Sequence, residues 1–229
     1  MKNSYTKIHY NKELRPYSNY SWLLCQHLAD KYYQSRSGTL LDVGCGRGEH
    51  VEIFNKLGFD AYGVDLEATA PKTSRVDLET EKIPFPDNYF DFIMSKSSIE
   101  HVRNVYHLTE EMRRVLKPGG KIVIMTCDWK AIHHIFYLDV DHKTPFMKCS
   151  LNDLLLRYDF KDVKVNYFFC LPYTWKNRFL HIFPLLIANI IRIDFAPTVK
   201  LNLLIKQVKF SREKQIIGYG RKPLNTENV

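Results

Sequence analysis

The stretch TLLDVGCGRGEH, residues 39–50, decides the fold. A short apolar run ends in Asp42, a turn containing Gly44, Gly46 and Gly48 follows, and the next residues have helical spacing. A strand, a glycine loop and a helix in this order form a site at which backbone amides approach a nucleotide-like ligand. The rest of the chain has to indicate which ligand and which chemistry.

Strand-like and helix-like segments alternate along the rest of the chain. Expected strands are residues 39–43, 60–65, 74–78, 90–95, 121–126, 163–169 and 215–220; expected helices are 18–33, 49–58, 105–120 and 150–160, the last with Ser150 as its N-cap. This alternation predicts an α/β fold with a doubly wound, seven-stranded, mostly parallel sheet. Residues 172–211, between the last two strands, are too many for an ordinary connection and predict a helical insertion.

Length and composition fit a single domain over residues 1–229, with residues 1–36 as an N-terminal cap and helix. The N-terminus lacks the apolar core of a secretory signal, and no apolar run is long enough to span a bilayer. The 5 cysteines form no C-x-x-C pair. We therefore expect neither a disulfide framework nor a zinc site, and we expect a reducing cytoplasmic setting.

The net charge of +8 points either to anionic partners or simply to solubility. Within residues 172–211, Lys and Arg far outnumber the single acid, Asp194, and Leu, Ile and Phe are frequent. This segment is expected to be a lid, a dimer surface, a peripheral membrane contact or a set of helices packed on the sheet.

The glycine loop departs from the dinucleotide fingerprint G-x-G-x-x-G, because Glu49 occupies the position of the third glycine. A pyrophosphate requires positive potential at the helix start, and the carboxylates of Asp42 and Glu49 would oppose it. Two acids beside the loop instead suit a ligand that carries an amino group and a sulfonium cation.

Four linked segments then carry a family resemblance. They are LLDVGCGRG (40–48), AYGVDLE (61–67), VDLETEKIPFPDNYFDFIMSKSSIEHV (76–102) and LKPGGKIVIMT (116–126). In order and spacing they resemble class I S-adenosylmethionine (SAM)-dependent methyltransferases, in the branch of the ubiquinone and menaquinone methyltransferases. The resemblance implies a Rossmann-like methyltransferase fold with the last strand antiparallel, and SAM as cofactor.

Roles for the loop and for the second strand follow. Gly44, Gly46 and Gly48 would let backbone amides reach the methionine carboxylate and the ribose. Asp65, at the end of its strand, either accepts both ribose hydroxyls, at about 1.5–3 kcal/mol each, or caps a helix. Leu66 would pack on the adenine, by resemblance.

The resemblance assigns further cofactor contacts. Asp77 either accepts from the adenine amino group, with the Leu78 backbone alongside, or caps a loop. Asp42 either orients the loop and the SAM amino group or is simply solvated, and Ser95 should lie near the transferred methyl group.

Candidates for a general base are His101, His133 and His142. His101 belongs to a Glu-His pair that is often structural in the family. His133 and His134 are adjacent on a helix-like segment, so their side chains diverge by about 100° and do not chelate one ion. No metal site is expected.

The sequence therefore predicts methyl transfer to oxygen of a small molecule or saccharide, with a lipid-linked or cell-surface glycan as the acceptor if residues 172–211 contact a membrane. An RNA or protein methyltransferase is the alternative enzyme, although no aromatic-basic platform for nucleic acid is visible. A SAM-binding regulatory protein without turnover is the alternative of another class. The oligomeric state stays open.

Overall fold

The computed structural model describes residues 19–175, 178–182, 184, 186 and 214–224. The helices are α2 (Asn19–Leu28, continued by a π-helical turn over Ala29–Tyr33), α3 (Glu49–Lys56), α4 (Val105–Val115), α5 (Trp129–Ile132) and α6 (Lys148–Arg157). The strands are β1 (Thr39–Val43), β2 (Asp60–Asp65), β3 (Thr73–Arg75), β4 (Phe90–Lys96), β5 (Leu116–Cys127), β6 (Lys161–Phe168) and β7 (Gln215–Arg221).

The strands form one 7-stranded sheet in the order β3-β2-β1-β4-β5-β7-β6. The pairs β1–β2, β2–β3, β1–β4 and β4–β5 are parallel. Strand β7 lies antiparallel between β5 and β6. The predicted doubly wound sheet with an antiparallel last strand is confirmed.

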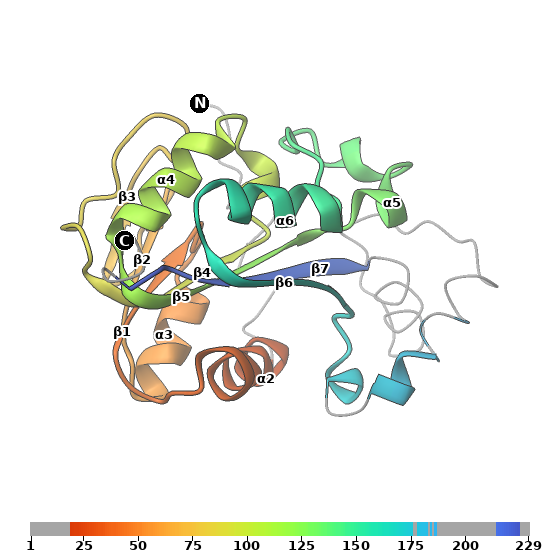
Figure 1. Cartoon of the computed structure of the whole chain (residues 1–229), viewed down its shortest axis with the longest axis horizontal. Helices are drawn as coiled ribbons and strands as arrows, with labels where there is room; N and C mark the ends of the chain where they lie inside the picture. Colours follow the sequence, from red (N-terminus) through yellow and green to blue (C-terminus); the bar gives the residue numbers. More distant parts are fainter. Residues whose placement is uncertain (1–18, 176–177, 183, 185, 187–213, 225–229) are drawn as a thin grey trace.

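Helices cover both faces of the sheet. In Figure 1, α4 and α6 lie on one face and α2 and α3 on the other. Alternate residues of β1 point to opposite faces of the sheet. Leu41 and Val43 pack in the core beneath α4 and α6, and Leu40 packs in the core beneath α2 and α3. Burial of both faces explains why the central strands are apolar almost throughout.

Two predicted element boundaries are wrong. The helix expected over 105–120 ends at Val115, and residues 116–120 begin β5. Pro118 disfavours helical geometry at the residue before it, and Leu116 pairs with Phe90 across an irregular register. The strand expected over 74–78 is only Thr73–Arg75, because Asp77 turns the chain away from the sheet.

The predicted N-cap of α6 is also wrong. Met147 is the N-cap, and Ser150 lies inside the first turn, where its Oγ accepts a hydrogen bond from the Met147 N–H at 2.9 Å. Ser150 is therefore the third helical residue of a capping box, whose side chain accepts a hydrogen bond from the backbone N–H of the N-cap residue.

Several predictions fall wholly or largely outside the described residues. Most of the insertion over 172–211 and all of residues 1–18 are among them, so a lid or membrane role for the insertion is an expectation only. All 5 cysteines lie among the described residues, and none of them forms a disulfide there. Among the described residues, no helix has the length and apolar character required to cross a bilayer.

Candidate active site

The candidate site lies where the strand order reverses. From β1 the chain proceeds to β2 and β3 on one side, and β4 and β5 lie on the other side of β1. The loops after β1 and β4 therefore leave in opposite directions, and ligands of open α/β sheets bind in the crevice between such loops. The glycine loop follows β1 at this point.

The glycine loop is held by backbone hydrogen bonds to the neighbouring strand. The N–H groups of Gly44 and Cys45 both donate to the carbonyl of Val64, at 2.8 and 3.1 Å. Gly44 has φ +79°, and a Cβ there would overlap the side chain of Ser98. Gly46 has φ +52°, and a Cβ there would meet nothing within 4 Å. The loop thus presents bare backbone to open space at Gly46.

Asp65 ties the end of β2 to this loop. Its Oδ2 accepts from the Gly46 N–H at 2.9 Å, and its Oδ1 accepts from the Glu67 N–H at 2.9 Å. Burial raises the pKa of the carboxyl, and these two hydrogen bonds partly oppose that rise. An ionised carboxylate has about four acceptor positions. Two bonds therefore leave Asp65 with capacity for further donors.

Leu66 follows Asp65 and is one of the exposed large apolar side chains, with 50% of its surface accessible. An apolar side chain beside a polar loop is suited to pack against a flat ring. Contact of Leu66 with an adenine stays a prediction.

Two buried polar side chains near the carboxyl ends of the central strands lack a full set of hydrogen-bond partners among the described residues. Asp42 in β1 is 1% exposed, and its Oδ2 has no hydrogen-bond partner among the described residues, the nearest cation candidate being His50 Nδ1 at 3.6 Å. Ser95 in β4 is fully buried, and its Oγ is likewise without a described partner. Buried polar groups are normally satisfied, so such atoms mark places where a ligand or water completes the bonding.

His50 was missed by the sequence reasoning. It lies in the first turn of α3, next to Glu49, and reaches back toward Asp42. The signal was its place directly after the glycine loop, where the helix start faces the end of β1.

Asp77 forms a turn in the loop after β3. Its Oδ1 accepts from the Glu79 N–H at 2.9 Å and its Oδ2 from the Thr80 hydroxyl at 3.1 Å. This is the loop-capping arrangement that the sequence left open, and it leaves acceptor positions on the carboxylate unused. Leu78 is half-buried against the core. Contact of either residue with an adenine stays a prediction.

Of the three candidate histidines, His101 and His142 come together and His133 lies apart. The rings of His101 and His142 have centroids 4.7 Å apart. His133 ends α5, is exposed, and its ring faces Trp129 at 6.2 Å. The neighbour of His101, Glu100, is 1% exposed.

Backbone hydrogen bonds bring these distant residues together. The N–H groups of Lys143 and Thr144 both donate to the carbonyl of Glu100, at 2.8 and 3.0 Å, and the Thr144 hydroxyl donates to the carbonyl of Val102 at 2.7 Å. The loop that carries His142 is therefore fixed along the segment that carries His101.

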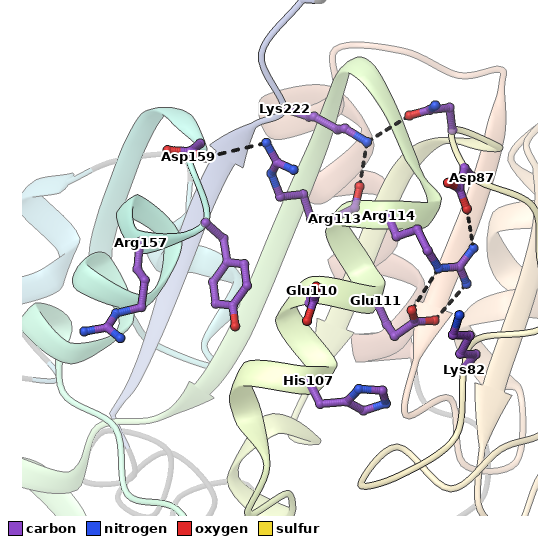
Figure 2. A pocket seen from close by; sticks show the side chains of 12 residues that line it. Lys82, Asp87, His107, Glu110, Glu111, Arg113, Arg114, Arg157, Asp159 and Lys222 are labelled. Atoms are coloured by element: carbon purple, nitrogen blue, oxygen red, sulfur yellow. Dashed lines mark hydrogen bonds and ion pairs between the residues drawn. The ribbon is translucent and has the colours of Figure 1, made fainter. Parts of the chain in front are cut away.

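A cavity of about 520 Å³ lies elsewhere, between α4 and α6 near the amino end of β4. Figure 2 shows Arg114 between Asp87 and Glu111, with N–O distances of 2.8 and 2.7 Å, and Lys222 donating to the carbonyl of Arg113. Its charged groups largely satisfy one another. It lies at the end of the sheet opposite the glycine loop, so we assign it a structural role.

Comparison with known proteins agrees with this geometry. Residues 41–124 match the methyltransferase domain family. Residues 41–124 form a methyltransferase domain of the class I, SAM-dependent type. SAM is the cofactor of this domain type, and the matched residues include the glycine loop and Asp65.

Two curated proteins are similar over part of their length. An uncharacterized methyltransferase of Mycolicibacterium gilvum is 35% identical over 105 residues, covering 42% of this chain and 41% of that protein. The ubiquinone/menaquinone biosynthesis C-methyltransferase UbiE of Burkholderia mallei is 28% identical over 103 residues, covering 38% and 42%. The chain thus spans about two fifths of these relatives.

A SAM-dependent methyltransferase from Archaeoglobus fulgidus, known as a crystal structure, has the same fold. Its TM-score is 0.62 at 22% identity, over 96% of this chain and 100% of that one. The shared fold therefore extends beyond residues 41–124 to the helices and strands on both sides.

Proposed function

We propose that this methyltransferase domain transfers a methyl group from SAM to an oxygen atom of a small molecule or saccharide. The observation that carries the proposal is Asp65, which is hydrogen-bonded to the glycine loop, has unused acceptor capacity, and lies beside the open face of Gly46. This arrangement fits a ligand that has ribose hydroxyls and needs close backbone approach.

The cofactor supplies a methyl group already activated by a sulfonium centre. In our proposal Asp65 accepts from the ribose hydroxyls, Leu66 packs on the adenine, and Asp77 with the Leu78 backbone receives the adenine amino group. The bare backbone at Gly44, Gly46 and Gly48 lets amides approach the methionine carboxylate and ribose, Asp42 receives the amino group, and Ser95 lies near the transferred methyl. The fit is supported by Asp42 Oδ2 and Ser95 Oγ, which are buried and have no hydrogen-bond partner among the described residues.

The chain's further task is to align the acceptor with that methyl group. Alignment of two bound reactants supplies roughly 7–11 kcal/mol of a barrier. A hydroxyl acceptor also loses a proton, and we propose His101 or His142 as the group that takes it, with exposed His133 as a less favoured candidate. The similar protein UbiE is named a C-methyltransferase, so experiment has to identify the acceptor atom of this chain.

The glycan and membrane parts of the proposal rest on sequence. Residues 172–211 are apolar and basic, a composition that suits contact with an anionic membrane surface that carries a lipid-linked acceptor. Cysteines without disulfides among the described residues fit a reducing cytoplasm as the place of work. An RNA or protein acceptor is the second candidate, but nucleic acid is the less favoured partner, because a net charge of +8 alone does not make an RNA enzyme.

The test is incubation with methyl-labelled SAM and fractionated cell extract. The proposal expects S-adenosylhomocysteine to form and the label to enter the metabolite or saccharide fraction. Label in the RNA or protein fraction would support the alternative enzyme. SAM binding with no S-adenosylhomocysteine in any fraction would support a regulatory SAM-binding protein.

A further inference from the structure

Glu100, His101 and His142 form a compact group of ionisable side chains for which neither the fold nor the cofactor site accounts. One carboxylate oxygen and one ring nitrogen from each histidine all lie within 4.8 Å of one another. A tetrahedral metal site with bonds of about 2.1 Å places its ligand atoms roughly 3.4 Å apart. A small rotation of the two half-buried histidines would close the group to that size.

The backbone contacts of the two histidines suit a role as metal ligands. His101 Nδ1 lies 3.2 Å from the carbonyl of Asp141, and His142 Nδ1 lies 2.6 Å from the carbonyl of Phe136. A carbonyl only accepts, so each Nδ1 is the donor in its contact, and the neutral tautomer that makes this bond has its lone pair on Nε2. A backbone carbonyl on the second ring nitrogen is the usual support of a ligating histidine.

The carboxylate supplies a second, independent indication. Glu100 is 1% exposed, and its Oε1 lies 3.8 Å from the Cys127 thiol. Its Oε2 is buried and has no hydrogen-bond partner among the described residues. A carboxylate that is nearly fully buried costs free energy unless a cation or donors compensate it. Both imidazoles lie beside this carboxylate.

The group is also fixed in place. Besides the bonds from Lys143 and Thr144 to the Glu100 carbonyl, the Lys143 ammonium pairs with Glu79 Oε1 at 2.8 Å. Glu79 in turn accepts from the N–H groups of Arg103 and Asn104. The segments on both sides of the group are thus clamped, which lowers the ordering cost of binding an ion.

We propose that Glu100, His101 and His142 bind one divalent transition-metal cation. Two imidazoles and one carboxylate form the ligand set of open catalytic sites, in which further positions are taken by water or substrate. Imidazole ligands favour Zn²⁺, Fe²⁺, Co²⁺ or Ni²⁺ over Mg²⁺, which favours oxygen ligands. The sequence-based expectation of no metal site overlooked this group because its members come from separate loops.

The position of the group suggests what the ion does. Ser98, two residues before Glu100, packs against Gly44 of the glycine loop. The ion would lie at the acceptor side of the same crevice, with open positions for an oxygen atom of the methyl acceptor. A histidine whose Nε2 binds the ion has no nitrogen left to accept a proton. With the ion bound, the ion itself would favour loss of the hydroxyl proton, in place of the histidine base proposed above. The role of the ion in methyl transfer rests on the proposed function, whereas metal binding itself does not.

The test is titration of the chelator-treated full chain with Zn²⁺ alone, followed by calorimetry, with Mg²⁺ in a parallel experiment. We expect one Zn²⁺ per chain and at least roughly 100-fold weaker binding of Mg²⁺. Glu100→Gln and His142→Gln each keep the side-chain volume close to the original, and each should weaken Zn²⁺ binding by roughly 100-fold. SAM binding by the same variants reports whether the fold is intact.

The matched control is the double variant His133→Gln/His134→Gln, which removes the exposed histidine pair after α5. It should leave Zn²⁺ binding unchanged. Loss of binding in this control, or unchanged binding in Glu100→Gln with SAM binding intact, would overturn the proposal. Zn²⁺ binding that survives in a chain without methyl transfer would leave the metal site standing and count against the proposed function alone.

Discussion

The Oδ2 atom of Asp65 accepts a hydrogen bond from the backbone N–H of Gly46 at 2.9 Å. This bond joins the end of β2 to the middle of the glycine loop after β1. It aligns a carboxylate with bare backbone along one edge of the crevice, and the cofactor contacts proposed above depend on that alignment.

Replacement of Asp65 by Asn should weaken SAM binding by roughly 10- to 100-fold, because each charge-assisted hydrogen bond contributes about 1.5–3 kcal/mol. Calorimetric titration with SAM measures the change. Unaltered SAM affinity in a folded Asp65→Asn protein would remove the ribose-binding role.

Two glycines of the same loop should respond differently to alanine. Gly44→Ala would place a Cβ against the Ser98 side chain, whereas Gly46→Ala would place one in open space. We expect Gly44→Ala to lower the free energy of unfolding by roughly 2–4 kcal/mol, and Gly46→Ala by only about 1–2 kcal/mol for its left-handed backbone.

The binding assay should show a contrast between the two variants. Gly46→Ala should retain its fold and lose SAM affinity, because the added methyl group occupies the face offered to the cofactor. Urea denaturation and SAM titration of both variants measure this. Equal SAM affinity in Gly46→Ala and the parent chain would mean that the cofactor does not approach that face.

Glu79 should make the free energy of unfolding depend on pH in the acidic range. Burial alone would raise the pKa of its carboxyl, but hydrogen bonds from Lys143, Arg103 and Asn104 outweigh burial and lower it from 4.5 to about 2. A depressed folded-state pKa contributes stability above pH 4.5, and this contribution is lost as the pH falls toward 2.

Glu79→Gln should therefore cost about 1–2 kcal/mol near neutral pH, after allowance for solvent screening of a partly exposed side chain. The cost should shrink on acidification to about pH 3, where the parent carboxyl begins to be protonated. Urea denaturation at both pH values measures it. The same difference at the two pH values would contradict the clamp that we assign to Glu79.

Arg114 should matter for stability and not for the cofactor. It pairs with Glu111, whose side chain is 7% exposed, and it donates to the carbonyls of Ile83 and Phe85. Arg114→Ala should lower the free energy of unfolding by about 3 kcal/mol, because it leaves a buried carboxylate without its cation. SAM affinity should stay within about twofold of the parent value. A large loss of SAM affinity in this variant would place a ligand in the cavity of Figure 2.

The sequence predicted the central part of the fold well, because local patterns determine it. The strands 39–43 and 60–65 match β1 and β2 residue for residue, since apolar runs bounded by turn residues have clear ends. The predicted end of α4 was wrong because Leu116 pairs with Phe90 in the sheet, and Phe90 is distant from it in sequence. A local pattern contains no information about such a partner.

The same distinction applies to the site. The glycine loop and Asp65 belong to contiguous motifs, so sequence reasoning could propose them together. The contact between His142 and Glu100–His101 depends on backbone bonds across a loop, and no spacing rule predicts it. His50 was missed for a similar reason, since its proximity to Asp42 arises only when the helix folds back over β1.

The measurement that tests the central claim most directly is a crystal structure of the full chain with S-adenosylhomocysteine. We expect the ligand over the glycine loop, with both ribose hydroxyls within hydrogen-bond distance of Asp65 and the sulfur facing Ser95. Density for the ligand in the cavity beside Arg114, or a ribose out of reach of Asp65, would contradict the account.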